Sequence, residues 1–291
     1  MPVVVTGASG MIGRAAVTAL AGRSPEVRAV VRRADAAPAL RSLGAKVAIT
    51  RLDDVATVAA VMEGAHTVLH LAGGLDLPDA AAVEEANART AARAVEAARA
   101  ARIRRFVLLS FPGADPASPD PYLAAKGRAE RIVEDSGLSY AVIRSNHVLG
   151  PGGVWTEALA RMSRSRPALV VGSGRQLLAP VFVDDVAAVL VAADDRRGLE
   201  SGTWALDGPR RLTADELADM AAGRHVRWKV HLSPASAARL SRLARRPASP
   251  VALAVLAADA AADAPDAAAE FGIVLTPLAD ALARSLPAAA E

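Results

Sequence analysis

The chain has 291 residues, of which 52% are hydrophobic and 3% aromatic, and its formal net charge is +3. This length allows one large α/β domain or two small ones, with a core of aliphatic side chains. Cysteine is absent, which excludes disulfides, thiolate metal sites and cysteine nucleophiles. No apolar run reaches the roughly eighteen residues of a membrane span and no signal-peptide pattern opens the chain, so we expect a cytoplasmic protein with no membrane partner.

Nearly all basic residues are arginine, since Lys46, Lys126 and Lys229 are the only lysines. The densest basic cluster consists of Arg239, Arg242, Arg245 and Arg246. Because no aromatic residue is interleaved with this cluster, we expect no nucleic-acid partner.

The first fourteen residues combine a strand, a glycine turn and a helix. Val3, Val4 and Val5 are β-branched and predict a buried strand. Glycines follow at 7, 10 and 13, and a helical pattern runs from Met11 to about residue 20. Such glycines allow a tight turn, a close approach of backbone N–H groups to a pyrophosphate, and close helix packing. The stretch therefore predicts a dinucleotide site at a helix N-terminus; the alternative is a tight connection without a ligand.

Strands and helices alternate through the first half. The pattern predicts further strands near 27–31, 47–49, 67–71, 105–110 and 140–144, and helices near 35–44, 55–62, 82–101 and 122–136. Regular alternation predicts a parallel sheet covered on both faces, which is an α/β, doubly wound (Rossmann) fold with its cofactor at the carboxyl ends of the strands.

The character of the chain changes at residues 150–153, Gly-Pro-Gly-Gly. Shorter elements follow: strands near 168–171, 180–183, 203–206 and 226–230, helices near 154–165, 184–195 and 213–222, and alanine-rich helices to the end. We expect one Rossmann-type domain over residues 1–291. Residues 1–149 would mainly bind cofactor, and 150–291 would mainly form a smaller substrate-binding lobe partly interleaved with the core.

Tyr122 and Lys126 are four residues apart on a predicted helix, so their side chains share a face. Asp120 is a natural N-cap and Pro121 a natural first-turn residue. The helix dipole and the Lys126 ammonium would both favour a phenolate and lower the pKa of Tyr122. This suits proton exchange with a carbonyl or alcohol, and Ser110 at the end of the fifth strand could bind the same oxygen. The alternative is a solvent-exposed pair.

Together these motifs resemble the short-chain dehydrogenase/reductase superfamily, in its extended or atypical branch near NmrA-like and NAD(P)-dependent epimerase-like members. The resemblance covers about residues 1–225 and 276–283. Its motifs are residues 6–13, 70–73, Asn87, Ser110, 122–126, 148–152 and 183–186.

The resemblance implies that Lys126 binds the nicotinamide ribose and that Tyr122 transfers the proton, with Ser110 beside them. The cofactor contacts it implies are Gly7, Ser9, Gly10, Met11, Ile12, Gly13, Arg32, Arg33, Leu52, Asp53, Leu71, Ala72, Gly73, Lys126, Ser145 and Asn146. Arg32 and Arg33 end the second strand, where NAD-preferring relatives often carry an acid. Two arginines there could pair with a 2′-phosphate, so we expect NADP(H), with NAD(H) as the alternative.

Three departures from the family pattern stand out. Relatives often have Gly-Asp-Leu after the third strand, where this chain has Thr50-Arg51-Leu52; Asp53 could replace the lost acid, and Arg51 could contact a phosphate or stack on adenine. The family's Arg-Pro after the sixth strand is Arg144-Ser145. The short loop 111–121 favours the atypical branch over sugar-nucleotide enzymes.

The expected substrate contacts are Phe111, Asn146, His147 and Trp155, although Trp155 could equally belong to the core. No histidine shows metal-ligand spacing, so we expect no metal.

These features predict an NADP(H)-dependent oxidoreductase. It would transfer hydride between nicotinamide and a carbonyl, alcohol or activated double bond of a small, mostly apolar molecule, as a monomer or homodimer. One alternative is a sugar-nucleotide epimerase or dehydratase with bound NAD. The other is a non-catalytic NmrA-like NADP-sensing regulator or assembly factor.

Overall fold

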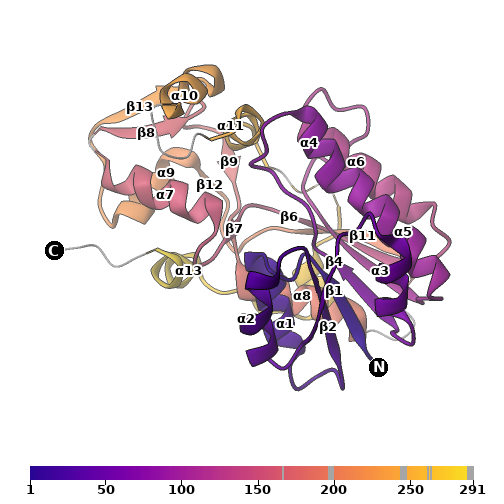
Figure 1. Cartoon of the computed structure of the whole chain (residues 1–291). Coiled ribbons are helices and arrows are strands. Elements are labelled where there is room, and N and C mark those ends of the chain that lie inside the picture. Colours follow the sequence, from indigo (N-terminus) through magenta and orange to yellow (C-terminus); the bar gives the residue numbers. More distant parts are fainter. Residues whose placement is uncertain (166, 196–199, 243–247, 261, 263, 287–291) are drawn as a thin grey trace.

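Seven parallel strands form the central sheet of the computed structural model, in the order β11-β6-β5-β4-β1-β2-β3 (Figure 1). The structure describes residues 1–165, 167–195, 200–242, 248–260, 262 and 264–286. The sheet strands are β1 (Val3–Thr6), β2 (Val27–Val31), β3 (Lys46–Ile49), β4 (Thr67–His70), β5 (Arg105–Ser110), β6 (Ser139–Ser145) and β11 (Gly202–Leu206). Since every pairing is parallel, all carboxyl ends meet at one edge, which confirms the predicted doubly wound fold.

Helices cover both faces of the sheet. On one face, α1 (Met11–Leu20) packs on α8 (Val183–Asp195), with α2 (Ala37–Ser42) and α12 (Ala267–Phe271) joining the same apolar core. On the other face lie α3 (Val55–Met62), α5 (Thr90–Ala100) and α6 (Pro121–Glu134). β1 is therefore buried along its whole length, as expected for a strand covered on both sides.

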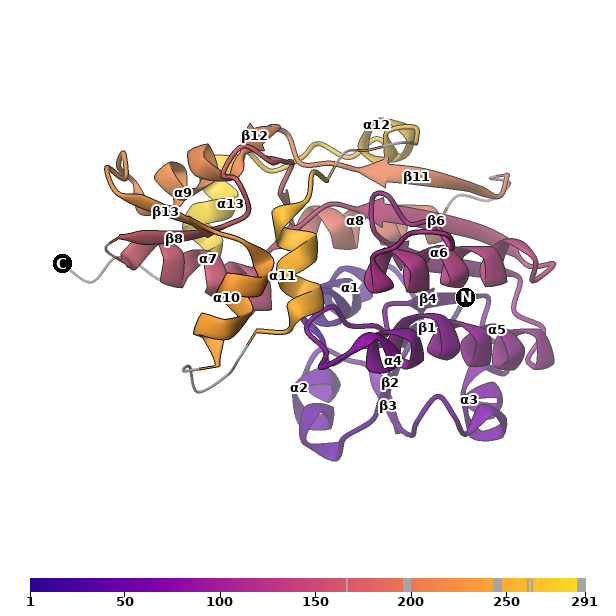
Figure 2. The same cartoon turned by 90° about the horizontal axis from the view of Figure 1, so that it is seen from above.

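A second lobe stands beyond the carboxyl edge of the sheet (Figure 2). It contains three strand pairs: β7 (Val148–Leu149) with β10 (Val181–Phe182), β8 (Ala168–Val171) with β13 (Lys229–Leu232), and β9 (Leu177–Leu178) with β12 (Leu212–Thr213). Its helices are α7 (Val154–Arg164), α9 (Ala214–Ala222), α10 (Pro234–Ser241), α11 (Pro250–Ala257) and α13 (Leu278–Ser285). The second half also supplies β11, α8 and α12 to the sheet layers.

Two of the predicted elements have other bounds in the structure. The helix expected over 82–101 is three segments: α4 (Ala80–Glu84), a π-helical turn η2 (Glu85–Arg89) and α5. The strand expected at 226–230 is β13, three residues later, because Asp219 of α9 accepts the Val226 N–H before the strand starts. No helix in the described part of the chain is long and apolar enough to cross a bilayer.

Candidate active site

The glycine turn after β1 brings three backbone segments into close contact. Gly7 has φ +69°, and a Cβ there would lie 2.6 Å from the Leu71 and Ala72 backbone. A Cβ on Gly13 would lie 2.3 Å from the Gly7 carbonyl oxygen. At Gly10 a Cβ would meet only that oxygen, at 3.4 Å. The turn is thus closed toward β4 and α1 and open above Gly10, where a phosphate group needs room.

A cavity of about 420 Å³ opens beside this turn. Nine predicted cofactor contacts line it: Gly7, Ser9, Gly10, Arg32, Leu52, Asp53, Leu71, Ala72 and Gly73. The opposite wall contains residues that the sequence did not suggest: Leu77, Ala82, Glu85, Ala86, Thr90 and Arg93. In the sequence these residues are marked only by their proximity to Asn87. Residue spacing does not reveal the π-helical turn η2, which decides which side chains of this stretch face the cavity. Met11, Ile12, Gly13, Arg33, Lys126, Ser145 and Asn146 do not line this cavity.

The two arginines at the end of β2 have different environments. Arg32 lines the cavity, whereas the Arg33 guanidinium is 80% exposed and bonds to Asp35. Arg51 also lines the cavity and forms an ion pair with Asp53 at 3.0 Å. The acid expected near the adenosine site therefore already has a cationic partner.

Helix α6 begins as predicted. The Asp120 carboxylate accepts from the backbone N–H groups of Tyr122 and Leu123, and Pro121 occupies the first turn. Further along, a Cβ on Gly127 would lie 2.3 Å from the nitrogen of Pro116. Loop 111–121 thus lies directly on α6, which places the residues after β5 beside Tyr122.

Lys126 is buried beneath the carboxyl end of β5. Its Nζ donates to the Leu109 carbonyl at 2.8 Å, and burial lowers its pKa to about 8 although Glu130 opposes this. A Cβ on Gly73 would lie 3.7 Å from this Nζ, so the ammonium borders the Gly73 backbone. At neutral pH it is mostly charged and lies where the ribose is expected.

Tyr122 is also buried, and its electrostatics differ from the prediction. Burial raises its pKa, and the Asp120 carboxylate raises it further. The Lys126 ammonium lies 5.9 Å from the ring centroid. The expectation of a lowered pKa is wrong for this state of the site, because desolvation of a phenolate outweighs the helix dipole. The phenol is fully protonated at neutral pH.

A chain of aromatic contacts begins at Tyr122. Its ring meets Phe111 edge-on at 5.6 Å, Phe111 meets His147 at 5.3 Å, and His147 meets Trp155 at 5.0 Å. Trp155 is half-buried against the same apolar cluster. Ser110, next to Phe111, is buried and its Oγ has no hydrogen-bond partner among the described residues. Predicted catalytic and substrate residues thus lie together.

Asn146 connects β6 to the second lobe. Its Nδ2 donates to Asp207 at 3.0 Å and to the Ala260 carbonyl at 2.9 Å, while its Oδ1 accepts from the His147 N–H at 2.8 Å. The neighbouring Ser145 hydroxyl donates to the Asn146 carbonyl. The amide's hydrogen bonds to protein partners place Asn146 in the connection between the lobes, and a ligand contact for Ser145 or Asn146 stays a prediction.

The hydrogen bonds of Asn146 define the state of His147. Its Nδ1 lies 3.1 Å from the same Asn146 Oδ1, an acceptor, so Nδ1 carries the proton. Burial lowers the pKa of His147 to about 4. Its Nε2 is therefore a buried lone pair, and it has no partner in the described residues.

The fold and the site together indicate a protein that binds a nicotinamide dinucleotide. The open turn over Gly10, the cavity beside it and the buried Lys126 fit a bound nicotinamide dinucleotide, and among the residues described no group of three His, Asp or Glu could hold a metal ion.

Comparison with known proteins gives the family. Residues 7–195 match the family model described as NAD(P)H-binding. The chain belongs to this NAD(P)H-binding family, within the extended short-chain dehydrogenase/reductase superfamily of reductases and epimerases.

Three relatives illustrate its range. A ceramide reductase of Caulobacter vibrioides is 34% identical over 190 residues, 65% of this chain and 60% of the reductase, so the chain spans less than two thirds of that relative. An uncharacterized sugar epimerase of Bacillus subtilis is 30% identical over 216 residues, 71% of this chain and 94% of that protein. Citrobacter sp. triphenylmethane reductase, solved with NADP(H), superposes with a TM-score of 0.80 at 20% identity, over 98% of this chain and all of that one.

Proposed function

We propose that the protein is an NADPH-dependent reductase of a small, mostly apolar molecule with a carbonyl or an activated double bond. The observation that carries this proposal is the group at the carboxyl end of β5: protonated Tyr122, charged Lys126 and the Ser110 hydroxyl, which has no partner among the residues described. The bound cofactor would supply the hydride. Related proteins named ceramide reductase and triphenylmethane reductase support the reaction class.

Each of the three residues has a separate role in this proposal. The Ser110 hydroxyl donates to the substrate oxygen and orients it. The Tyr122 phenol donates its proton to that oxygen as negative charge develops. Lys126 donates to the ribose hydroxyls and, through its charge, stabilises the phenolate left behind. Because its pKa is raised, Tyr122 is protonated at neutral pH and carries the proton that reduction of a carbonyl consumes.

The aromatic walls support a planar or apolar substrate. Phe111 and Trp155 lie at 5.3 Å and 5.0 Å from the His147 ring, and His147 Nε2 offers a hydrogen-bond acceptor in these apolar surroundings. A buried acceptor without a partner is costly, so a substrate with a hydroxyl or N–H group near its carbonyl would pair with it. The proposed class is therefore hydroxylated aromatic ketones, quinones and enones.

The preference for NADPH rests on Arg32, which lines the nucleotide cavity and has no carboxylate partner in the part of the chain described. Arg33 is its matched control, since it is exposed and paired with Asp35. We expect Arg32→Gln to weaken NADPH binding about tenfold or more, the worth of a charge-assisted bond of about 1.5–3 kcal/mol, and to leave NADH binding unchanged. Arg33→Gln should change neither. Fluorescence titration measures both constants, and equal effects of the two substitutions would contradict the assignment.

The activity itself is tested with Tyr122→Phe. The substitution removes the phenolic hydroxyl and keeps the ring and its packing, so NADPH should bind within about twofold of wild type. Turnover on a panel of quinones, aryl ketones and enones should fall by about 10²–10⁴, the usual contribution of a general acid. Full turnover by this variant would refute the role of Tyr122.

A sugar-nucleotide epimerase is the second candidate, and similarity to the Bacillus subtilis epimerase over 94% of its length favours it. An epimerase retains its nucleotide and consumes none overall. NAD that co-purifies with the protein, together with interconversion of UDP-sugars, would support this function. Tight NADPH binding without turnover on either substrate panel would favour the regulator.

A further inference from the structure

The positive charge of the chain is concentrated in one segment of the second lobe. Between Asp219 and Asp259 there is no acidic residue, whereas arginine or lysine occurs at 224, 227, 229, 239, 242, 245 and 246. These seven basic residues carry more positive charge than the net +3 of the whole chain, so the rest of the chain has a net negative charge. Within this segment lie β13 and α10, which pack on each other at the end of the lobe remote from the central sheet (Figures 1 and 2).

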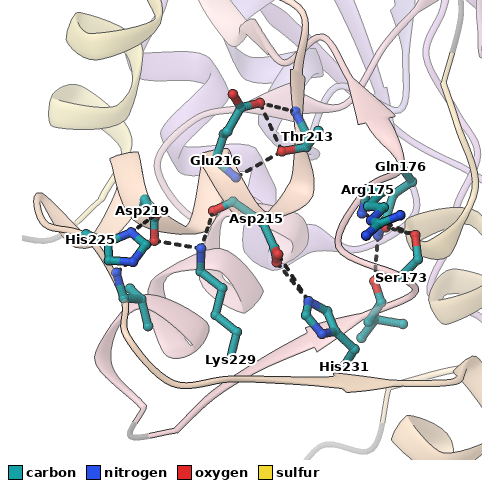
Figure 3. Close-up of polar contacts among 12 residues, drawn as sticks. Ser173, Arg175, Gln176, Thr213, Asp215, Glu216, Asp219, His225, Lys229 and His231 are labelled. Carbon is teal, nitrogen blue, oxygen red and sulfur yellow. Dashed lines mark hydrogen bonds and ion pairs between the residues drawn. The ribbon is translucent and has the colours of Figure 1, made fainter.

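The side chains of strand β13 that face α9 form ion pairs with carboxylates of that helix. Lys229 and His231 point to α9, where they bond to Asp219 at 2.8 Å and Asp215 at 3.0 Å (Figure 3). The α9 carboxylates are thus engaged on the inner side of the strand. Because side chains alternate along a strand, Val230 points the other way and is 40% exposed, beside its register partner Leu169.

The segment around β13 and α10 combines unpaired cations with exposed apolar groups. Four exposed arginines have no carboxylate partner among the residues described: Arg224, Arg227, Arg239 and Arg242. Trp228 is 70% exposed, and its ring lies 5.8 Å from the Arg227 guanidinium. Leu240 of α10 is 46% exposed and lies in sequence between Arg239 on the same helix and Arg242 at its C-cap. Exposed tryptophan beside arginine is typical of surfaces that meet the interface of a bilayer.

We propose that this basic face, formed by the four arginines with Trp228, Val230 and Leu240, docks the protein on an anionic lipid surface. The guanidinium groups pair with headgroup phosphates, and Trp228 enters the interfacial layer. Charge complementarity favours an anionic partner. The exposed aliphatic groups favour lipid over nucleic acid, because a phosphate backbone offers them nothing to bury against. The sequence has no apolar run long enough to predict a membrane-spanning helix. Adsorption to the surface of a bilayer does not require such a helix.

The test measures co-sedimentation of the full chain with vesicles of phosphatidylcholine alone and with 30% phosphatidylserine. The wild type should bind the anionic vesicles and not the neutral ones, and binding should weaken with salt. Each arginine near such a surface contributes about fivefold (about 1 kcal/mol), so Arg239→Gln with Arg242→Gln should lose roughly 25-fold. The matched control, Arg23→Gln with Arg99→Gln, removes two exposed arginines from the other lobe and should change binding less than twofold.

Tryptophan fluorescence gives a second, local readout. Trp204 is buried and Trp155 half-buried, so a blue shift on vesicle binding should come from Trp228 and disappear in Trp228→Phe. Equal binding to neutral vesicles, equal losses in the two arginine pairs, or an unshifted spectrum would each overturn the proposal. Binding to a duplex oligonucleotide through the same arginines, without vesicle binding, would assign the face to nucleic acid instead. NADPH binding and turnover do not enter this test, so the proposal stands or fails apart from the proposed function.

Discussion

A buried ion pair below the proposed catalytic residues offers a sharp test of the site's electrostatics. Glu130 lies one turn after Lys126 on α6, and its side chain is 4% exposed. Arg144 of β6 holds it in a bidentate bond, with Nε at 3.0 Å from Oε1 and Nη2 at 2.6 Å from Oε2. Arg144 also donates to the Ala114 carbonyl at 3.2 Å, so the pair joins α6, β6 and loop 111–121, which begins with Phe111.

Glu130→Gln keeps the volume of the side chain but removes its charge and turns a donor toward the guanidinium. Removing one partner of a buried pair costs about 3–5 kcal/mol. The amide oxygen can keep one hydrogen bond, so we expect about 3 kcal/mol. At about 2 °C per kcal/mol for a chain of this size, the melting temperature should fall by roughly 6 °C.

The same substitution should change the titration of Lys126. Glu130 raises the pKa of that lysine, against the larger lowering by burial that leaves it at about 8. Without the carboxylate the pKa of Lys126 falls below that value. If turnover requires the ammonium, the alkaline limb of the pH–rate profile then moves to lower pH.

Asp135→Asn is the matched control for both measurements. Asp135 is the C-cap of α6 and its partner Arg131 lies four residues earlier. Both side chains are 69% exposed, so the loss should stay below about 0.5 kcal/mol. Urea unfolding of the three proteins gives the free energies, and single-substrate kinetics from pH 6 to 10 give the profiles. Equal stability of the two variants would refute the buried-pair argument. An unmoved alkaline limb in a destabilised Glu130→Gln would refute the link to Lys126.

Two further predictions concern buried histidines and the glycine turn. Burial lowers the pKa of His70 to about 3 and that of His147 to about 4, so below pH 6.5 the unfolded chain binds their protons and the folded chain does not. The unfolding free energy should therefore fall as pH drops from 6.5 toward 4, by up to about 1.4 kcal/mol per pH unit for each histidine, and His147→Phe should remove about half of this slope in urea titrations. Gly7→Ala should abolish NADPH binding, whereas Gly64→Ala, with the same φ of +69° but no neighbour within 4 Å of a Cβ, should cost about 1–2 kcal/mol and bind normally.

The strands of the sheet could be predicted to within about two residues because each is a short β-branched or aliphatic run between glycine or charged turns. β7, β9 and β12 were not expected, since a two-residue pairing has no period to detect. The π-helical turn at Glu85–Arg89 also gave no signal: alanine-rich sequence fits a regular helix equally well. Its rotation, which places Glu85 and Arg93 on the nucleotide cavity, follows from packing against α6.

Tyr122 shows where a chemical prediction from spacing fails. Spacing along a helix gives the dipole, the N-cap and the shared face with Lys126, and all three are present. Burial of both side chains depends on the second lobe, which lies far from the motif in sequence. It also depends on loop 111–121, which folds back onto α6 at Gly127. Desolvation then decides the sign of the pKa shift, because it acts on the charged form of each group without regard to helix position.

Asn146 shows the same limit for hydrogen bonding. Its place after β6 correctly predicts a polar residue at the carboxyl edge of the sheet, and from there a cofactor contact is a reasonable expectation. Its amide protons are taken by Asp207 and Ala260, which are 61 and 114 residues away in the chain. These distant partners orient Oδ1 toward His147, put the imidazole proton on Nδ1 and leave Nε2 as the acceptor. The free acceptor of the proposed substrate site is thus set by residues that have no part in the sequence motif, because a buried amide first satisfies its own hydrogen bonds.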